Sequence, residues 1–432
     1  MSTTSERARC EPARTAVRWK IFAVMLCLIT INYVDRASLS IAMPLLASEF
    51  NISPVVQGLV LSSFFWTYAA MQVPGGLLAD RFKPRVVIGA ATVFWGAFQG
   101  LAAACTNAPA LLLARLGLGA AEAPIFPAGG KLIGMWMSRE ERGRGATLLD
   151  GGAPLGAALG SLLIAGLISA LGSWRSAFAI AGIATVLAGV AAWLYIRNTP
   201  REHRATNESE ALHIEQSIAR DIASEPPNLS GRSLDFLKSR SVWCMFFGWM
   251  CFNSVFYGLL TWMPNYLHAV QGFDIKKIGG SSFIIFFSGF VGEMVGGWIA
   301  DRCVAAGFSQ NRIMRTLFGI AAVIATVSVF SVAYQKNSTT VVALLASTLF
   351  FLRWCGLYWC IPSLIGSRNK VGFLGGLMNL GGNVGGVLVP IVVGFIVQYS
   401  HSYFLALMVF AGAGAGLFVC SCLIDYEEKL AV

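Results

Sequence analysis

Charged residues are scarce in this sequence. Only 12% of its 432 residues are charged, whereas 56% are hydrophobic, and a typical soluble domain carries about 25% charged residues. Apolar runs of about 20 residues, the length that a helix needs to cross the hydrocarbon core, recur along nearly the whole chain. The only long polar stretch covers residues 198–240. These observations predict an all-α integral membrane protein rather than a soluble domain with one anchor.

Motifs of catalysis and metal binding are also lacking. The ten cysteines include no CxxC pair, and no cysteine and histidine residues share metal-ligand spacing. We find no nucleophile and base set and no glycine-rich phosphate loop. We therefore expect no metal, no cofactor and no enzymatic activity.

The basic residues report orientation rather than nucleic-acid binding. Lysine and arginine outnumber the acidic residues by 32 to 22, but they lie in short loops between apolar runs instead of forming one patch. They are concentrated before the first run and after the second, fourth, sixth and eighth, as in the segments 81–85 and 302–315, and the alternate loops carry few besides Lys276, Lys277 and Lys336. Because cytoplasmic loops retain positive charge, both termini are expected in the cytoplasm, with a bacterial inner membrane as the location.

Twelve spans are predicted, and the polar segment divides them six and six. The expected organisation is a cytoplasmic tail (1–17), a first bundle (18–197), a linker (198–240), a second bundle (241–425) and a C-terminal tail (426–432). The expected spans are 18–43, 54–79, 85–105, 108–135, 145–170, 174–197, 242–268, 278–302, 312–334, 339–366, 371–397 and 403–425.

An internal repeat supports the division into halves. The segment 75–81 (GGLLADR), which closes the second span, recurs as 296–302 (GGWIADR) at the end of the eighth. Arg115 precedes Pro124 by nine residues in the fourth span, and Arg353 precedes Pro362 by nine in the tenth. Two pseudo-symmetric bundles with a substrate site at their interface are the architecture that such a repeat indicates.

Glycine is abundant in the fifth and eleventh spans. The spacing of Gly156 and Gly160 in the fifth span lets neighbouring helices approach closely. We interpret this spacing as packing within the chain and expect a monomer.

The loop motifs resemble those of the major facilitator superfamily, and the likeness covers essentially the whole chain. Segments 32–37 (NYVDRA), 72–76 (QVPGG), 122–124 (EAP) and 379–383 (NLGGN) resemble its anion:cation symporter branch. That branch includes sugar-acid and phthalate-like permeases. The resemblance implies a twelve-helix fold and a carboxylate substrate that moves together with protons.

Several charges lie inside the expected spans, although each costs at least about 2.5–3.5 kcal/mol at the bilayer centre. Arg115 and Glu122 are two helical turns apart and share one face of the fourth span. Arg115 can bind a substrate carboxylate through paired donors. The alternative is a structural ion pair. The intramembrane charges are Asp35, Arg36, Arg115, Glu122, Asp150, Glu293 and Arg353.

Two carboxyl groups are candidates for proton coupling. Burial disfavours a charged Glu122, so this side chain can carry a proton. The same holds for Asp35, although the adjacent Arg36 is expected to favour its charged form. The resemblance implies that Asp35 and Glu122 couple protons while Arg36 alternates between Glu122 and the substrate.

Two positions, one in each half, depart from the sugar-acid relatives. Arg353 occupies the place equivalent to Arg115, so the two arginines are able to clamp a dianion; alternatively, Arg353 neutralises Glu293. Asp150 and Glu293 are possible additional charged sites. Ala153 stands where sugar-acid permeases carry an amide or hydroxyl side chain, which weakens the case for binding substrate hydroxyls.

Uncharged side chains complete the candidate substrate site, with core packing as the alternative for each. The resemblance places Tyr33 and Tyr68 near the anion and two asparagines on the opposite wall. A further group at the ends of spans is expected to latch the cytoplasmic side. The substrate candidates are Tyr33, Tyr68, Tyr257, Tyr358, Trp359, Asn379 and Asn383, and the latch candidates are Asp80, Arg81, Arg85, Asp301 and Arg302.

The expected function is proton-coupled uptake of a small organic anion, such as a sugar acid, by alternating access. Uptake of an aromatic or aliphatic dicarboxylate and proton-driven efflux of a metabolite or drug are the alternatives on the same fold. The expected partners are the organic anion, protons and the lipid bilayer, without nucleic acid.

Overall fold

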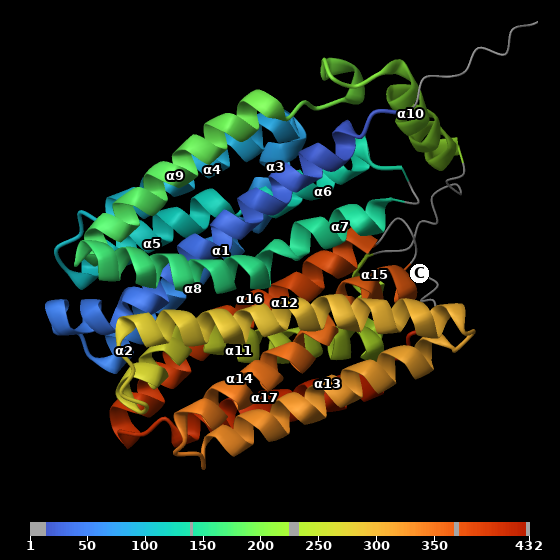
Figure 1. The fold of residues 1–432 in the computed structure, drawn as a ribbon. Coiled ribbons are helices and arrows are strands. Elements are labelled where there is room, and N and C mark those ends of the chain that lie inside the picture. Colours follow the sequence, from blue (N-terminus) through green and yellow to red (C-terminus); the bar gives the residue numbers. More distant parts are fainter. Residues whose placement is uncertain (1–13, 139–140, 224–232, 367–370, 429–432) are drawn as a thin grey trace, which may run out of the picture.

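The structure is a computed structural model that describes residues 14–138, 141–223, 233–366 and 371–428. All regular structure in these segments is helical. Figure 1 shows two groups of long helices side by side, with α10 at one end. The expected N-terminal tail lies largely outside the described residues, as does the end of the C-terminal tail.

The first group of helices runs from α1 to α9, and the second from α11 to α17. The first contains α1 (Val17–Phe50), α2 (Pro54–Ala70), α3 (Gln72–Phe82), α4 (Pro84–Ala102), α5 (Ala108–Glu122), α6 (Ile125–Trp136), α7 (Arg142–Asp150), α8 (Gly152–Leu171) and α9 (Trp174–Tyr195). The connection holds η1 (Pro200–Glu202), α10 (Glu208–Ala223) and η2 (Ser233–Lys238). The second contains α11 (Arg240–Ala269), α12 (Ile275–Ala305), α13 (Gln310–Val332), α14 (Ser338–Leu352), η3 (Arg353–Cys360), α15 (Ile361–Ile365), α16 (Val371–Ser400) and α17 (Phe404–Leu423).

The helices account for the twelve expected spans. In the described residues, 11 helical stretches are long and apolar enough to cross a membrane. The one remaining span is the second along the chain. It consists of α2 and α3, which are separated by a break at Met71. The prediction of an all-α, twelve-helix membrane protein is therefore confirmed.

The predicted end of the first span at Met43 is wrong. Helix α1 continues through Pro44 and ends at Asn51, whose φ of 51° is left-handed and whose N–H bonds the Ala47 carbonyl. Helix α11 likewise contains Pro264. A proline removes one backbone hydrogen bond, but ending a helix within hydrocarbon leaves several groups unpaired, so membrane helices retain prolines.

Three spans are broken beside a charged residue. Glu122 is the last residue of α5, Asp150 is the last of α7, and Arg353 is the first of η3. The backbone at Ala123, Gly151 and Arg353 stays in the right-handed helical region. These three breaks lie beside intramembrane charges, whereas the break at Met71 does not.

Glycines bring equivalent helices together in both bundles. Helix α8 packs on α1, with Gly156 against the Thr30 carbonyl. Helix α16 packs on α11, where a Cβ atom on Gly381 would stand 2.5 Å from the Phe246 oxygen. The predicted close packing within the chain is confirmed, and it follows the internal repeat.

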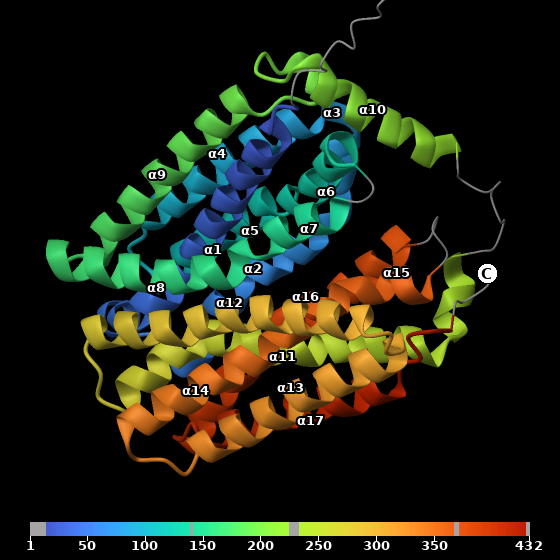
Figure 2. The ribbon, with the colours of Figure 1, turned by 45° about the vertical axis from the view of Figure 1, so that its right-hand side comes forward.

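The bundles join at the ends farthest from α10. Helix α2 packs on α16, and α8 packs on α12. The Asn265 amide donates to Gln57 Oε1 at 2.8 Å, and the Val55 N–H donates to Gln398 Oε1 at 3.2 Å. Figure 2 shows the bundles diverging toward the end that carries α10.

The connection is anchored to the first bundle through Glu210 of α10. This fully buried carboxylate accepts the N–H groups of Val17 and Arg18 at 3.1 and 3.3 Å, so it caps the start of α1. It also pairs with Arg18 Nη1 at 2.7 Å, while Glu141 binds the same guanidinium at 2.9 Å. One linker carboxylate thereby joins α10 to the first span.

Replacing this cap tests the anchoring. Glu210→Ala removes an N-cap and one partner of a buried guanidinium, so we expect a loss of about 1–2 kcal/mol of stability. Thermal unfolding of the detergent-purified protein measures the change. Glu208→Ala, at an exposed position of the same helix, is the control. Equal melting temperatures for the two variants would contradict the anchoring.

Candidate functional site

The middle of α1 directs three neighbouring side chains toward three different surroundings. Successive helical residues point about 100° apart. Tyr33 meets α11, Asp35 meets α4 and α9, and Arg36 meets α2 and α5. One turn of helix therefore supplies an aromatic ring, a carboxylate and a guanidinium to separate contacts.

Arg36 forms a buried ion pair with Glu122. Its Nε and Nη2 atoms lie 3.0 and 2.9 Å from Glu122 Oε2, and neither side chain is more than 3% exposed. The guanidinium also faces the rings of Phe64, Tyr33 and Tyr68, with its Cζ atom 4.4, 4.6 and 4.7 Å from their centroids. Opposite charge and the ring faces together compensate for the lost hydration of Arg36.

Arg115 lies beside this pair and makes few polar contacts. Its Nη1 donates to the backbone oxygen of Asp35 at 3.4 Å, and its Cζ is 5.7 Å from the Phe64 centroid. The buried Nε atom has no hydrogen-bond partner among the described residues. A buried guanidinium with an unused donor suits an anionic ligand, because an unpaired buried donor is costly.

Asp35 is held by uncharged donors. Its Oδ2 accepts the Trp95 Nε1–H at 3.0 Å and the Thr185 hydroxyl at 2.9 Å. The expectation that Arg36 favours the charged form of Asp35 is not matched by a contact between them, because Arg36 pairs with Glu122 instead. The second oxygen of Asp35 has no partner in the described chain.

Arg353 pairs with carboxylates of both bundles. Its Nη2 lies 2.6 Å from Glu293 Oε2 in α12 and 3.4 Å from Asp150 Oδ2 in α7. Of the two roles left open by the sequence, pairing with Glu293 is the one observed. The bond to Asp150 was not expected, and it crosses from one bundle to the other.

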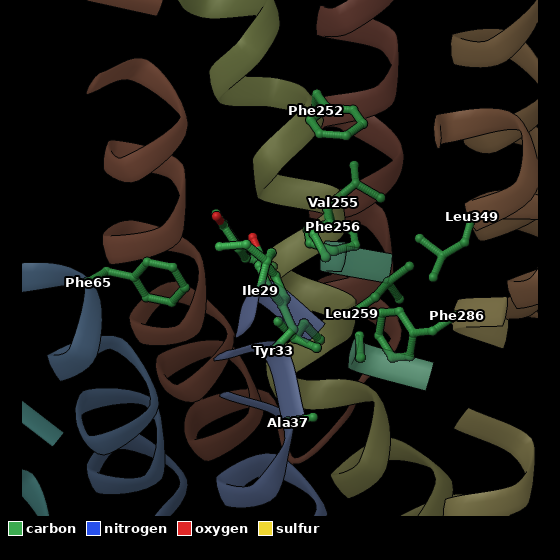
Figure 3. Close-up of a cluster of buried hydrophobic side chains, with 14 of the residues drawn as sticks. Ile29, Tyr33, Ala37, Phe65, Phe252, Val255, Phe256, Leu259, Phe286 and Leu349 are labelled. Carbon is green, nitrogen blue, oxygen red and sulfur yellow. The ribbon is translucent and has the colours of Figure 1, made fainter. Parts of the chain in front are cut away.

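An aromatic layer separates the two charged groups. Tyr33 contacts Phe256 with ring centroids 6.4 Å apart, and Phe65 contacts Tyr257 at 4.5 Å. Figure 3 shows Tyr33 beside Phe256 and Leu259, with Phe65 on one side and Phe286 on the other. Side chains of α1, α2, α11 and α12 thus meet between the bundles.

Comparison with known proteins agrees with this arrangement. The sequence profile of the Major Facilitator Superfamily matches residues 25–390. The chain belongs to the major facilitator superfamily. A member of this family is a membrane transporter rather than an enzyme, which accords with charged side chains buried between two bundles.

Two relatives of this major facilitator protein are bacterial transporters. The probable galactarate/D-glucarate transporter GarP of Escherichia coli K12 is 31% identical over 412 residues, which are 92% of each chain. The probable galactarate/D-glucarate transporter GudP of Bacillus subtilis 168 is 30% identical over 414 residues, or 93% of this chain and 90% of the relative. Both alignments run across the two bundles.

A solved structure shares the major facilitator fold. It is the crystal structure of a bacterial homologue of the human lysosomal transporter Spinster, in an inward-facing and unoccupied conformation. The TM-score is 0.75 at 15% sequence identity, with 97% of this chain and 100% of that chain covered. Similarity at this identity concerns the fold.

The remaining candidates lie apart from the buried charges. Tyr358 is fully buried within the second bundle, where it shares a 2.7 Å hydrogen bond with Ser421 and packs against Phe318. Trp359 is 40% exposed. Asn383 is buried and donates to the Asn379 backbone oxygen at 3.1 Å, and the Asn379 side chain is half-buried.

The expected latch residues lie at helix ends. Arg81, Asp301 and Arg302 are exposed, and the Arg302 guanidinium faces the Trp298 ring at 4.9 Å. Arg85 joins α4 to α9 by donating to the Trp193 oxygen at 2.9 Å. The side chain of Asp80 lies outside the described residues, and the latch stays a prediction.

Sequence reasoning missed the side chains that hold the charges. Trp95 and Thr185 bind Asp35, and Phe64 and Phe256 face the arginines. A threonine within an apolar span is a weak signal, because its hydroxyl can also bond its own helix. Aromatic residues carry no signal at all in a chain with 29 phenylalanines.

Arg36→Lys tests the contribution of the buried pair. An ammonium group keeps the charge but cannot lie flat against three rings, so we expect a loss of about 2 kcal/mol of stability. Thermal unfolding without substrate measures it. Arg175→Lys is the control, because Arg175 also faces a ring and pairs with Glu49 but is partly exposed, and its loss should stay below about 1 kcal/mol. Equal losses would contradict the role of burial.

Proposed function

We propose that this protein imports a small organic acid together with protons by alternating access. The observation that carries the proposal is the buried Arg36–Glu122 ion pair, with Arg115 beside it holding an unused donor. The names of the relatives, galactarate and D-glucarate transporters, support sugar acids as the first compounds to test.

The two arginines supply the substrate contacts in this proposal. Arg115 binds a carboxylate through the donor that has no partner among the described residues. Arg36 binds Glu122 through Nε, and its Nη1 and Nη2 atoms have no hydrogen-bond partner among the described residues. A substrate carboxylate that engages these donors draws the same positive charge away from Glu122. Substrate and Glu122 therefore compete for Arg36.

Protonation of Glu122 decides that competition. A neutral carboxyl group attracts a guanidinium far less than a carboxylate does. A proton on Glu122 frees Arg36 for the substrate, and loss of the proton returns Arg36 to Glu122. Asp35 is the second coupling carboxyl group, which Trp95 and Thr185 hold in place when it is charged. Proton and anion then bind together and leave together.

Orientation follows from the loop charges. The end that carries α10 faces the cytoplasm of a bacterial inner membrane, with both termini there. Because the bundles diverge toward that end (Figure 2), the conformation is inward-facing. In the outward-facing state the contacts between α2 and α16 open, and the exposed latch residues of the α3 and α12 ends meet. The protein works as a monomer.

Uptake into proteoliposomes tests the proposal. Sugar acids that raise the melting temperature of the purified protein are offered with an inward proton gradient. Arg115→Ala should weaken uptake at least tenfold at low substrate concentration, because charged hydrogen bonds contribute about 1.5–3 kcal/mol. Glu122→Gln should bind the acid but no longer accumulate it against its gradient.

Arg175→Ala is the control for both variants, since it removes an arginine of a partly exposed ion pair. Its uptake should follow that of the wild type. Full uptake by Arg115→Ala would remove the anion-site assignment. Gradient-driven accumulation by Glu122→Gln would remove Glu122 from coupling.

A further inference from the structure

Arg353, Glu293 and Asp150 form a charged group that the proposed mechanism leaves unused. The three side chains are 4%, 11% and 27% exposed, and they come from η3, α12 and α7. One guanidinium here faces two carboxyl groups. In the first bundle, by contrast, Asp35 and Glu122 are matched by Arg36 and Arg115. The interface triad therefore carries one negative charge in excess when every group is ionised.

A buried excess charge is costly, so the triad is expected to bind a further positive charge. The groups that face Arg353 from the surrounding elements are Glu293 of α12, Asp150 of α7 and Tyr33 of α1, with Cys355 on its own element. From α11 it meets only the rings of Phe252 and Phe256. A proton taken up by Glu293 restores neutrality and leaves Arg353 paired with Asp150 alone.

The triad also lies next to the first anion site. The Arg353 guanidinium is 5.3 Å from the Phe256 centroid, and Phe256 contacts Tyr33. Tyr33 in turn lies against Arg36, 4.6 Å from its guanidinium carbon. Two arginines, one from each bundle, thus flank the same pair of rings. Two rings in contact, Tyr33 beside Arg36 and Phe256 beside Arg353, connect the two guanidinium groups.

Each of these arginines is held by a glutamate. Arg36 pairs with Glu122, and Arg353 pairs with Glu293. A proton on either glutamate weakens its pair and frees guanidinium donors. Because Asp150 belongs to the other bundle, the second pair also changes when the bundles move.

We infer that Arg353, Glu293 and Asp150 form a second, proton-gated anion site that takes the second acidic group of a dianionic substrate. This inference rests on the proposed function. When Glu293 takes up a proton, the Arg353 donors pass from Glu293 to the second carboxylate. Two anionic groups then enter with two protons, one for each bundle, and the proton on Glu293 leaves when Arg353 returns to it.

Matched acids test the site in binding measurements on the purified protein. Galactarate and galactonate share a carbon chain and differ in one carboxylate, as do phthalate and benzoate. We consider the pH range in which Glu122 and Glu293 each take up a proton on binding. There the affinity for the dianion should rise up to about 100-fold for each pH unit of acidification, and the affinity for the monoanion up to about tenfold. Equal pH dependence within both pairs would overturn the inference.

Two variants separate the effect of protonating Glu293 from the effect of the Arg353 guanidinium. Glu293→Gln should reduce the pH dependence of the dianion to that of the monoanion, because Arg353 then has no titrating glutamate to leave and keeps only its longer contact with Asp150 at every pH. The double variant Arg353→Gln/Glu293→Gln removes cation and carboxylate together, so it leaves no unpaired charge from this pair. It should lose roughly 10–100-fold in affinity for the dianion, and with it the preference for the dianion over the monoanion.

The controls keep this inference distinct from the proposed function. Glu49→Gln/Arg175→Gln removes a partly exposed ion pair, and the preference between the matched acids should persist. If the double variant keeps the dianion preference, the second site is refuted while proton-coupled binding of the monoanion stands. If no acid binds the wild type at any pH, both the proposed function and the second site are refuted.

Discussion

The fold is organised around the requirement that neighbouring groups offset the cost of burying Arg36 in the membrane. Arg36 meets this requirement with one carboxylate and three aromatic rings. The cost of burying a lone ion is several kcal/mol, so the helices around Arg36 must keep their positions relative to Glu122.

Three helix breaks lie beside intramembrane charges. Glu122, Asp150 and Arg353 each stand where a helix ends or tightens. The broken helices are buried among their neighbours, which is why they persist at membrane depth.

Duplication explains what the two bundles share, and the charges explain how they differ. Glycines on α8 and α16 let these helices pack closely on α1 and α11, respectively. Yet Asp35, Glu122, Arg36 and Arg115 lie together within the first bundle, whereas Arg353 pairs with Glu293 of its own bundle and also reaches Asp150 of the other. The second bundle's arginine is therefore sensitive to how the bundles meet, and the first bundle's arginines are sensitive to their own helices.

The sequence by itself determined the membrane class, the twelve spans, the duplication and the identity of the buried charges. Each of these depends on composition, on helix-length apolar runs or on repeated segments, which are properties of the chain in order. Only the tertiary structure decided the partners of those charges. Asp35 bonds Thr185, 150 residues away, instead of the adjacent Arg36, and Arg353 reaches Asp150 across 203 residues. Neighbours on a helix point apart by about 100°, so contact is fixed by helix packing and not by proximity in sequence.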